Sequence, residues 1–293
     1  MKISRRDFLK WSVAAAAALQ LNLDMDSINR VLAAESDPPV IWLQGAGCTG
    51  CTISTLNVTD PATIDKVLMT KVSMKYNSSI MTSAGETAMQ ALENAANQYE
   101  GQFILVVEGA VPSGTKKNYC KIGELNGVEV TMEDALLKYG PKAKYVVAAG
   151  ACASFGGVAA AYPNDAGCTA VKNILGSKIA NPVVNLPGCP VHPSMIINIL
   201  LELFLVGMPK LDSHHRPTEF YGNNIHWTCD RKGLPEVAQV GLYGCYKNVG
   251  CKGPGCKNLC SVKKWNNQSY CTVVNYPCIG CAKPNFPTNP LTI

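Results

Sequence analysis

The sequence predicts an α/β fold, a parallel sheet covered by helices, followed by an irregular region organised by cysteine side chains. Two observations predict the sheet: five short apolar runs recur before residue 209, and helical patterns lie between or after several of them. One observation predicts the irregular region: beyond about residue 210, periodicity fades and Gly, Pro, Asn, Lys and Cys dominate. Such a region has little apolar core of its own, so covalent or coordinate bonds must organise it.

The expected elements alternate along the chain. The expected strands are residues 40–43, 72–76, 103–108, 145–149 and 183–186, and the expected helices are residues 84–99, 132–139, 168–175 and 194–206. Parallel strands place their ligand sites outside their carboxyl ends. Four cysteines follow three of these strands and are therefore expected at one edge of the sheet: Cys48, Cys51, Cys152 and Cys189.

Composition bounds the class of protein. The chain has 293 residues, of which 47% are hydrophobic, enough for one large or two medium domains. Charged residues make up 16%, below the roughly 25% of an average soluble chain, and a large surface buried against a partner would explain this deficit. The net charge of +5 is mild and no basic helix accompanies it, which argues against a nucleic-acid partner.

Residues 1–34 have the pattern of a twin-arginine signal peptide. Arg5 and Arg6 precede an apolar run of 13 residues, 11–23, which is too short to span a bilayer of about 30 Å. Residues 31–34 offer a small-residue cleavage site. The alternative is an amphipathic N-terminal helix with two chance arginines. A twin-arginine signal predicts export of an already folded protein, so cofactors can be inserted in the cytoplasm.

The 14 cysteines indicate metal ligands better than disulfides. The chain is too large to need disulfide bonds for stability, and the twin-arginine route implies folding in a reducing compartment. Cys48 and Cys51, Cys278 and Cys281, and His226 and Cys229 have the two-residue separation of metal-ligand pairs. Spacing alone leaves the metal open, and an exported zinc- or disulfide-stabilised binding protein is the alternative.

A dinucleotide site is the rival interpretation of the first loop. Residues 45–50 fit the pattern G-x-G-x-x-G after an expected strand. The acidic residue expected at the end of the second strand is absent, since Tyr76 and Asn77 stand there. Cysteines also occupy the loop that a pyrophosphate would need, so nucleotide binding is disfavoured.

The region after residue 210 holds nine candidate ligands, which suit two metal clusters with one residue spare. They are His226, Cys229, Cys245, Cys251, Cys256, Cys260, Cys271, Cys278 and Cys281. The spacing leaves open which of the nine is spare. Cys120 and Cys168 lack paired spacing and are expected to be free thiols. His192, His214 and His215 are interpreted as turn or surface residues.

Five motifs occur in a characteristic order. They are Gly-Cys-Thr-Gly-Cys (47–51), Pro-Gly-Cys-Pro (187–190), Asn-Ile-His-x-x-Cys (224–229), Gly-Cys-Lys-Gly-Pro (250–254) and Cys-Ile-Gly-Cys (278–281). Together they resemble the small subunit of nickel–iron hydrogenases over essentially the whole mature chain. The resemblance implies a flavodoxin-like domain at residues 35–208 that holds a proximal cluster. It also implies an irregular domain at residues 209–293 that holds a medial and a distal cluster.

The resemblance carries ligands over residue by residue. It implies that Cys48, Cys51, Cys152 and Cys189 bind the proximal cluster, that His226, Cys229, Cys245 and Cys251 bind the distal one, and that Cys260, Cys278 and Cys281 bind the medial one. Cys271 stands where the selenium-containing branch has a fourth medial thiolate, and Gly47 is also typical of that branch. We therefore expect three 4Fe–4S clusters, with a medial 3Fe–4S cluster if Cys271 is not a ligand. Cys256 is the residue that this assignment leaves spare.

The resemblance also implies a role and partners. A separate large subunit would carry the nickel–iron site that splits hydrogen, and this chain would conduct electrons to an external acceptor without any catalytic residue of its own. A multihaem c-type cytochrome, of the cytochrome c3 type, is the expected acceptor. The chain shows no C-terminal apolar helix, so we expect a heterodimer without an integral membrane anchor in this chain. Its place would be the periplasm or the outer face of the cytoplasmic membrane.

Overall fold

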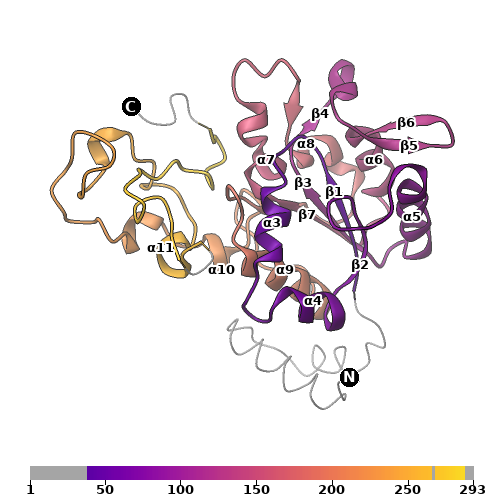
Figure 1. Ribbon diagram of the computed structural model, residues 1–293, viewed down its shortest axis with the longest axis horizontal. Coiled ribbons are helices and arrows are strands. Elements are labelled where there is room, and N and C mark those ends of the chain that lie inside the picture. Colours follow the sequence, from indigo (N-terminus) through magenta and orange to yellow (C-terminus); the bar gives the residue numbers. More distant parts are fainter. Residues whose placement is uncertain (1–37, 266–267, 288–293) are drawn as a thin grey trace, which may run out of the picture.

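The computed structural model describes residues 38–265 and 268–287; the expected signal peptide, residues 1–34, lies outside them. A five-stranded sheet forms the centre of the first part (Figure 1). Its strands are β1 (Pro39–Gln44), β2 (Ser73–Asn77), β3 (Ile104–Glu108), β7 (Tyr145–Ala149) and β9 (Val184–Leu186). All neighbouring pairs are parallel, in the order β2-β1-β3-β7-β9, which is the flavodoxin-like order. The predicted fold class is confirmed.

Successive side chains of each strand point to opposite faces of the sheet, so an apolar core forms on each face. On one face, Val40, Val106 and Val147 pack with the helices α4 (Ile64–Thr70) and α9 (Pro193–Leu205). The opposite face packs against α5 (Gly85–Gln98), α6 (Met132–Tyr139) and α8 (Val171–Leu175). Because helices cover both faces, β1, β3 and β7 are mostly apolar, whereas the edge strand β2 also carries Ser73 and Lys75.

Each expected strand and helix has an observed counterpart, but one helix begins later than expected and several observed elements, α3 (Gly50–Leu56), α4 and α7 (Gly150–Phe155) among them, were not expected. Cys168 and Thr169 form the short strand β8 (Cys168–Thr169), which pairs with β4 (Val111–Pro112), so the expected helix begins only at α8. A hairpin of β5 (Lys121–Leu125) and β6 (Val128–Thr131) was not expected. Like α3 and α7, the 3-10 turns η1 (Gly114–Tyr119), η2 (Gly157–Ala160) and η3 (Gly176–Lys178) are short.

From α10 (Thr218–Tyr221) onward the chain forms a lobe with little regular structure beside α3 and α9 (Figure 1). Its described elements are η4 (Ile225–Thr228), η5 (Lys247–Val249) and α11 (Cys260–Lys263). Three hydrogen bonds connect this lobe to the sheet domain and the segment after α9. Tyr221 Oη donates to the Pro187 carbonyl at 2.8 Å, Arg216 Nη1 donates to the Ala282 carbonyl at 2.8 Å, and His192 Nε2 lies 3.0 Å from the Lys264 carbonyl.

Candidate metal centres

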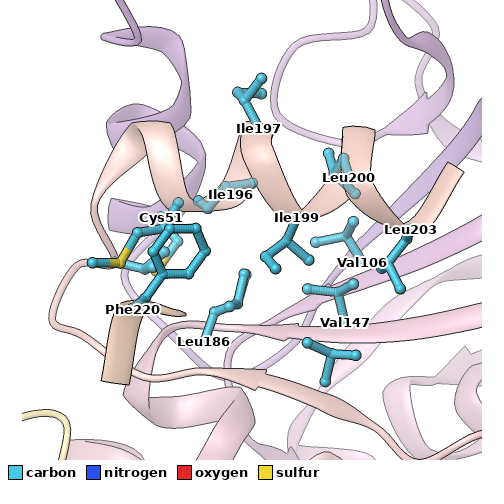
Figure 2. Close-up of a cluster of buried hydrophobic side chains, with 14 of the residues drawn as sticks. Cys51, Val106, Val147, Leu186, Ile196, Ile197, Ile199, Leu200, Leu203 and Phe220 are labelled. Atoms are coloured by element: carbon cyan, nitrogen blue, oxygen red, sulfur yellow. The ribbon is translucent and has the colours of Figure 1, made fainter. Parts of the chain in front are cut away.

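The four expected proximal ligands lie at the carboxyl edge of the sheet. Cys48 and Cys51 follow β1, Cys152 lies in α7 directly after β7, and Cys189 follows β9. β1 and β3 are neighbours at the point where the strand order reverses, the usual ligand site of such sheets. Figure 2 shows Cys51 at the end of an apolar cluster that includes Phe220 of α10 and Ile196 of α9. The fold therefore brings these cysteines together from three separate strand ends.

Glycines let the backbone approach these sulfur atoms. A Cβ atom added to Gly150, whose φ is +91°, would lie 2.5 Å from Cys51 Sγ. One added to Gly157, whose φ is +54°, would lie 2.8 Å from Cys152 Sγ and 2.7 Å from its nitrogen. Both positions combine a left-handed backbone with a close contact, so side chains larger than hydrogen would displace the thiols.

Burial and mutual charge oppose ionisation of the proximal thiols. Burial, followed by the Glu108 carboxylate, raises the pKa of Cys51 well above its ordinary value, and Cys152 and Cys189 add to the effect. Burial and then the charges of Cys152 and Cys48 raise the pKa of Cys189 to about 11. Buried thiols whose charges repel one another lose their protons together only when a positive charge is nearby. A bound metal provides that charge.

Glu108, at the end of β3, is buried beneath the first cysteine pair. Its carboxylate accepts hydrogen bonds from the backbone N–H groups of Cys51 (2.8 Å) and Thr52 (3.0 Å) in the first turn of α3. It also accepts from Thr52 Oγ1 (2.5 Å) and Trp42 Nε1 (3.2 Å). Glu108 thus fixes the backbone of Cys51 from a neighbouring strand. In the sequence, the signal for this role is the place of Glu108 at the end of a buried strand.

Four cysteines of the lobe form a second set: Cys260, Cys271, Cys278 and Cys281. Burial, followed by the charges of Cys278 and Cys271, raises the pKa of Cys260 to about 12. Burial also raises the pKa of Cys281, and Cys260, Cys278 and Cys271 all contribute. Cys271 therefore lies among the three cysteines that the resemblance assigns to the medial cluster.

The expected distal ligands form the third set. The Asn224 side chain caps η4 by accepting from the backbone N–H of His226 at 3.0 Å. The thiols of Cys229 and Cys251 accept from the backbone N–H groups of Arg231 (3.4 Å) and Gly253 (3.5 Å), an arrangement that stabilises thiolate charge. Cys245 is held by its backbone, which donates to the Pro235 carbonyl and accepts from Val237 N–H. Its charge acts on Cys229.

The three sets adjoin one another in the order proximal, medial, distal. Cys189 of the first set is close enough to Cys271 and Cys281 of the second for their charges to influence each other. In the same way, the charge of Cys278 acts on Cys251 of the third set. One pocket is lined by members of the second and third sets: His226, Cys229, Cys251, Cys260, Cys271, Cys278 and Cys281.

Cys256 lies behind the medial set. Its side chain is fully buried and hydrogen-bonded to Cys278, and it does not line the pocket. Cys120 and Cys168 lie near each other in the sheet domain, and the charge of Cys152 also acts on Cys168. His192, expected to be a turn or surface residue, lies in the segment just before α9; it is buried, and its Nδ1 caps α9 by accepting from the Ser194 N–H.

The cysteines do not form disulfides or a site for one ion. All 14 are free thiols. Among the described residues, no three His, Cys, Asp or Glu side chains are grouped to hold a single metal ion. A zinc ion needs its four ligands about 2.0–2.3 Å away, whereas each thiolate of an iron–sulfur cube binds a different iron and stands further from the others. Three sets of soft thiol donors, one with an imidazole, fit iron–sulfur clusters.

Comparison with known proteins identifies the family. Residues 48–203 match the family described as NADH ubiquinone oxidoreductase, 20 Kd subunit, and residues 221–292 match the C-terminal family of the NiFe/NiFeSe hydrogenase small subunit. The periplasmic [NiFeSe] hydrogenase small subunit of Desulfomicrobium baculatum is 35% identical over 98% of this chain and 97% of its own. The chain belongs to the nickel–iron hydrogenase small-subunit family. The quinone-reactive Ni/Fe-hydrogenase small chain of Wolinella succinogenes is 36% identical over 97% of this chain and 81% of its own.

Solved structures agree. The [NiFeSe] hydrogenase of Desulfovibrio vulgaris Hildenborough superposes with a TM-score of 0.79 and 40% identity, covering 87% of this chain and 96% of that one. The reduced, active Ni-Fe-Se hydrogenase of Desulfomicrobium baculatum gives a TM-score of 0.81 at 36% identity, covering 86% of this chain and 96% of that one.

The hydrogenase small subunit is thus an electron-transfer chain of a heterodimeric enzyme, and the hydrogen site lies in its large subunit. Its family carries iron–sulfur clusters. Residues 2–21 match the twin-arginine translocation signal family, so the chain is exported as expected. Within the described part of the chain, every helix is too short or too polar to cross a membrane.

Proposed function

We propose that this small subunit binds three 4Fe–4S clusters through 11 cysteines and one histidine and relays electrons from the large subunit to an external acceptor. The proximal ligands are Cys48, Cys51, Cys152 and Cys189; the medial ligands are Cys260, Cys271, Cys278 and Cys281; the distal ligands are His226, Cys229, Cys245 and Cys251. When bound, such clusters accept and release single electrons at potentials that the protein sets.

The observation that carries this proposal is the contiguity of the three ligand sets. The charge of Cys271 acts on Cys189, the charge of Cys189 acts on Cys281, and the charge of Cys278 acts on Cys251. Each set therefore lies next to the following one. In the same proposal, residues 35–208 form the proximal-cluster domain and residues 209–293 the medial and distal one. Exposed Cys48 and Cys189 would be covered by the large subunit. We further propose a periplasmic location, or one at the outer face of the membrane, with a multihaem c-type cytochrome as acceptor.

Metal analysis of the anaerobically purified heterodimer tests the proposal. We expect about 12 cluster irons and 12 sulfides per heterodimer, beside the iron of the large-subunit site. Eleven cluster irons, with the paramagnetic signal of an oxidised 3Fe–4S cluster, would remove Cys271 from the ligands and leave the relay in place. A colourless protein with zinc in place of iron would refute the relay itself.

A further inference from the structure

Charge is distributed unevenly along the small subunit. Residues 209–293 contain ten lysines and arginines but four aspartates and glutamates, a net charge of +6, whereas the whole chain carries +5. The lobe that holds the medial and distal ligand sets is therefore strongly basic, and the rest of the chain is nearly neutral. A basic surface on an electron-transfer lobe raises the question of what it attracts.

Four lysines lie close to the distal ligands along the chain or across a β-bridge. Lys232 N–H donates to the Cys229 carbonyl at 3.2 Å, and Lys252 directly follows Cys251. Lys257 pairs with Asn224 across a β-bridge, two residues before His226. Lys247 lies two residues after Cys245 and pairs with Glu236, whose hydrogen bond and charge raise the pKa of the lysine. Lys232, Lys247 and Lys257 are exposed, and Lys252 is half-buried.

The carboxylates nearby are already engaged. Asp230 accepts hydrogen bonds from Tyr270 Oη and Thr272 Oγ1, each at 2.7 Å, and Glu236 pairs with Lys247 at 2.7 Å. Within the part of the chain that the structure describes, Lys232, Lys252 and Lys257 have no ion-pair partner. Their charges are therefore available to a molecule that approaches the distal set.

Exposed aromatic side chains accompany these lysines. Trp227, next to His226, is 63% exposed, and Tyr243, two residues before Cys245, is 74% exposed. The Arg231 guanidinium lies 4.0 Å from the centroid of the Tyr243 ring. Exposed Trp and Tyr side chains are enriched in protein-docking surfaces, whereas the Arg231 beside Tyr243 is itself buried.

We propose that this basic aromatic surface, made of Trp227, Lys232, Tyr243, Lys247, Lys252 and Lys257, docks an electron-carrier protein with carboxylates around its redox group. The inference rests on the proposed function, because it takes His226, Cys229, Cys245 and Cys251 as the electron exit. Opposite charge accelerates encounter and orients the carrier's redox group toward that exit. A carrier with lysines around its redox group is repelled by the same surface.

The test compares two c-type cytochromes as acceptors of the hydrogen-reduced holoenzyme: one with an acidic haem edge and one with a lysine-ringed haem edge. At low salt, we expect kcat/KM for the acidic cytochrome to be at least about tenfold higher, and to fall as ionic strength rises. Equal rates, faster reduction of the lysine-ringed cytochrome, or a rate for the acidic cytochrome that rises with salt would overturn the proposal.

Charge reversal locates the surface. Lys257→Glu and Lys232→Glu should each lower kcat/KM for the acidic cytochrome about fivefold through KM. Lys172→Glu, an exposed position on α8, makes the same charge change far along the chain and should leave that constant unchanged. Equal effects of all three variants would contradict a local docking surface. Iron content and reduction of a small viologen dye report separately on the cluster assignment, and both should stay unchanged in every variant.

Discussion

The carboxylate of Glu108 accepts a 2.8 Å hydrogen bond from the backbone N–H of Cys51, so the end of β3 fixes a cysteine that follows β1. Four donors converge on this buried carboxylate. An amide could accept with its oxygen alone, while its NH2 group would face donors. We therefore expect Glu108→Gln to destabilise the proximal region by about 2–3 kcal/mol and to lower cluster iron from about 12 toward 8.

Thermal unfolding and iron analysis of the purified heterodimer check this prediction. The matched control is Glu86→Gln, because Glu86 is exposed and accepts one backbone hydrogen bond, from Asn126 N–H. The control should keep its iron and change stability by less than about 0.5 kcal/mol. Full iron content in Glu108→Gln would show that the Cys51 backbone keeps its position without the carboxylate.

Gly157 should tolerate no side chain. Its φ of +54° is left-handed, and an added Cβ would lie 2.7–2.8 Å from atoms of Cys152. Gly176 has a similar φ of +46° but no atom within 4 Å of an added Cβ. We expect Gly157→Ala to be about 1–3 kcal/mol less stable than Gly176→Ala and to lose proximal iron, as measured by denaturant unfolding and metal analysis. Equal losses in the two variants would mean that backbone strain alone limits both positions.

Gly50 and Gly157 also bear on whether the enzyme tolerates oxygen. Gly50 and Gly157 occupy the positions at which, by the family resemblance, oxygen-tolerant members carry two extra cysteines. Without those thiolates, we expect an ordinary proximal cubane that undergoes one one-electron step in a potentiometric titration followed by electron paramagnetic resonance. Two successive one-electron oxidations of the proximal cluster at accessible potentials would contradict this expectation.

The sequence predicts most of the sheet because β1, β3 and β7 are buried on both faces and are mostly apolar runs. It predicts the position of the proximal set because Cys48, Cys152 and Cys189 come shortly after three strand ends. The hairpin of β5 and β6 was missed because its residues are largely exposed and lack a buried face. In the lobe, the sequence shows the spacing of the cysteines but no hydrophobic periodicity. The number of candidate ligands could therefore be predicted, but their positions in space could not. The contact of Cys256 with Cys278 depends on a turn closed by the Cys256 N–H and the Gly253 carbonyl, which spacing does not reveal.

Asp212 and Arg216 should make the connection to the lobe sensitive to acid. Arg216 is 4% exposed, pairs with Asp212 at 2.7 Å and donates to the Ala282 carbonyl. Burial would raise the pKa of Asp212, but hydrogen bonds from Arg216 outweigh it and hold that pKa below its ordinary value. The stabilisation is therefore present above about pH 4 and is lost as pH falls through the lowered pKa.

We expect Asp212→Asn to cost about 3 kcal/mol at pH 7, because it leaves a buried guanidinium without its counter-ion. The difference from the unmodified protein should shrink below about pH 4, where Asp212 itself becomes protonated. Unfolding midpoints of both proteins across a range of about pH 3–7 measure this. Glu129→Gln breaks the exposed pair with Lys121 and should cost less than about 1 kcal/mol at every pH. A pH-independent cost of Asp212→Asn would refute the assignment.

Cys256 should tune the medial potential without binding iron. Its fully buried thiol donates a hydrogen bond to Cys278 and lowers the pKa of that thiol. Hydrogen bonds to ligand sulfur stabilise the more negative, reduced cluster. We therefore expect Cys256→Ala to lower the medial midpoint potential with about 12 cluster irons retained, and Cys256→Ser to restore part of the shift. Loss of iron in Cys256→Ala would instead make Cys256 a ligand.

Cys271 decides the type of the medial cluster. Its thiol lines the same pocket as Cys260, Cys278 and Cys281, and the charge of Cys271 acts on both Cys260 and Cys281. Replacing it with proline removes the fourth thiolate, so three remaining cysteines would hold three irons. We expect Cys271→Pro to contain about 11 cluster irons and, once oxidised, to give the paramagnetic signal of a 3Fe–4S cluster that the unmodified enzyme lacks.

Cys271→Ala should do the same, which separates the effect of the lost thiolate from any backbone effect of proline. Cys168→Ala removes a buried thiol outside the three sets and should keep about 12 irons and no such signal. A full-occupancy 3Fe–4S signal in the unmodified, anaerobically purified enzyme would show that Cys271 is a free thiol.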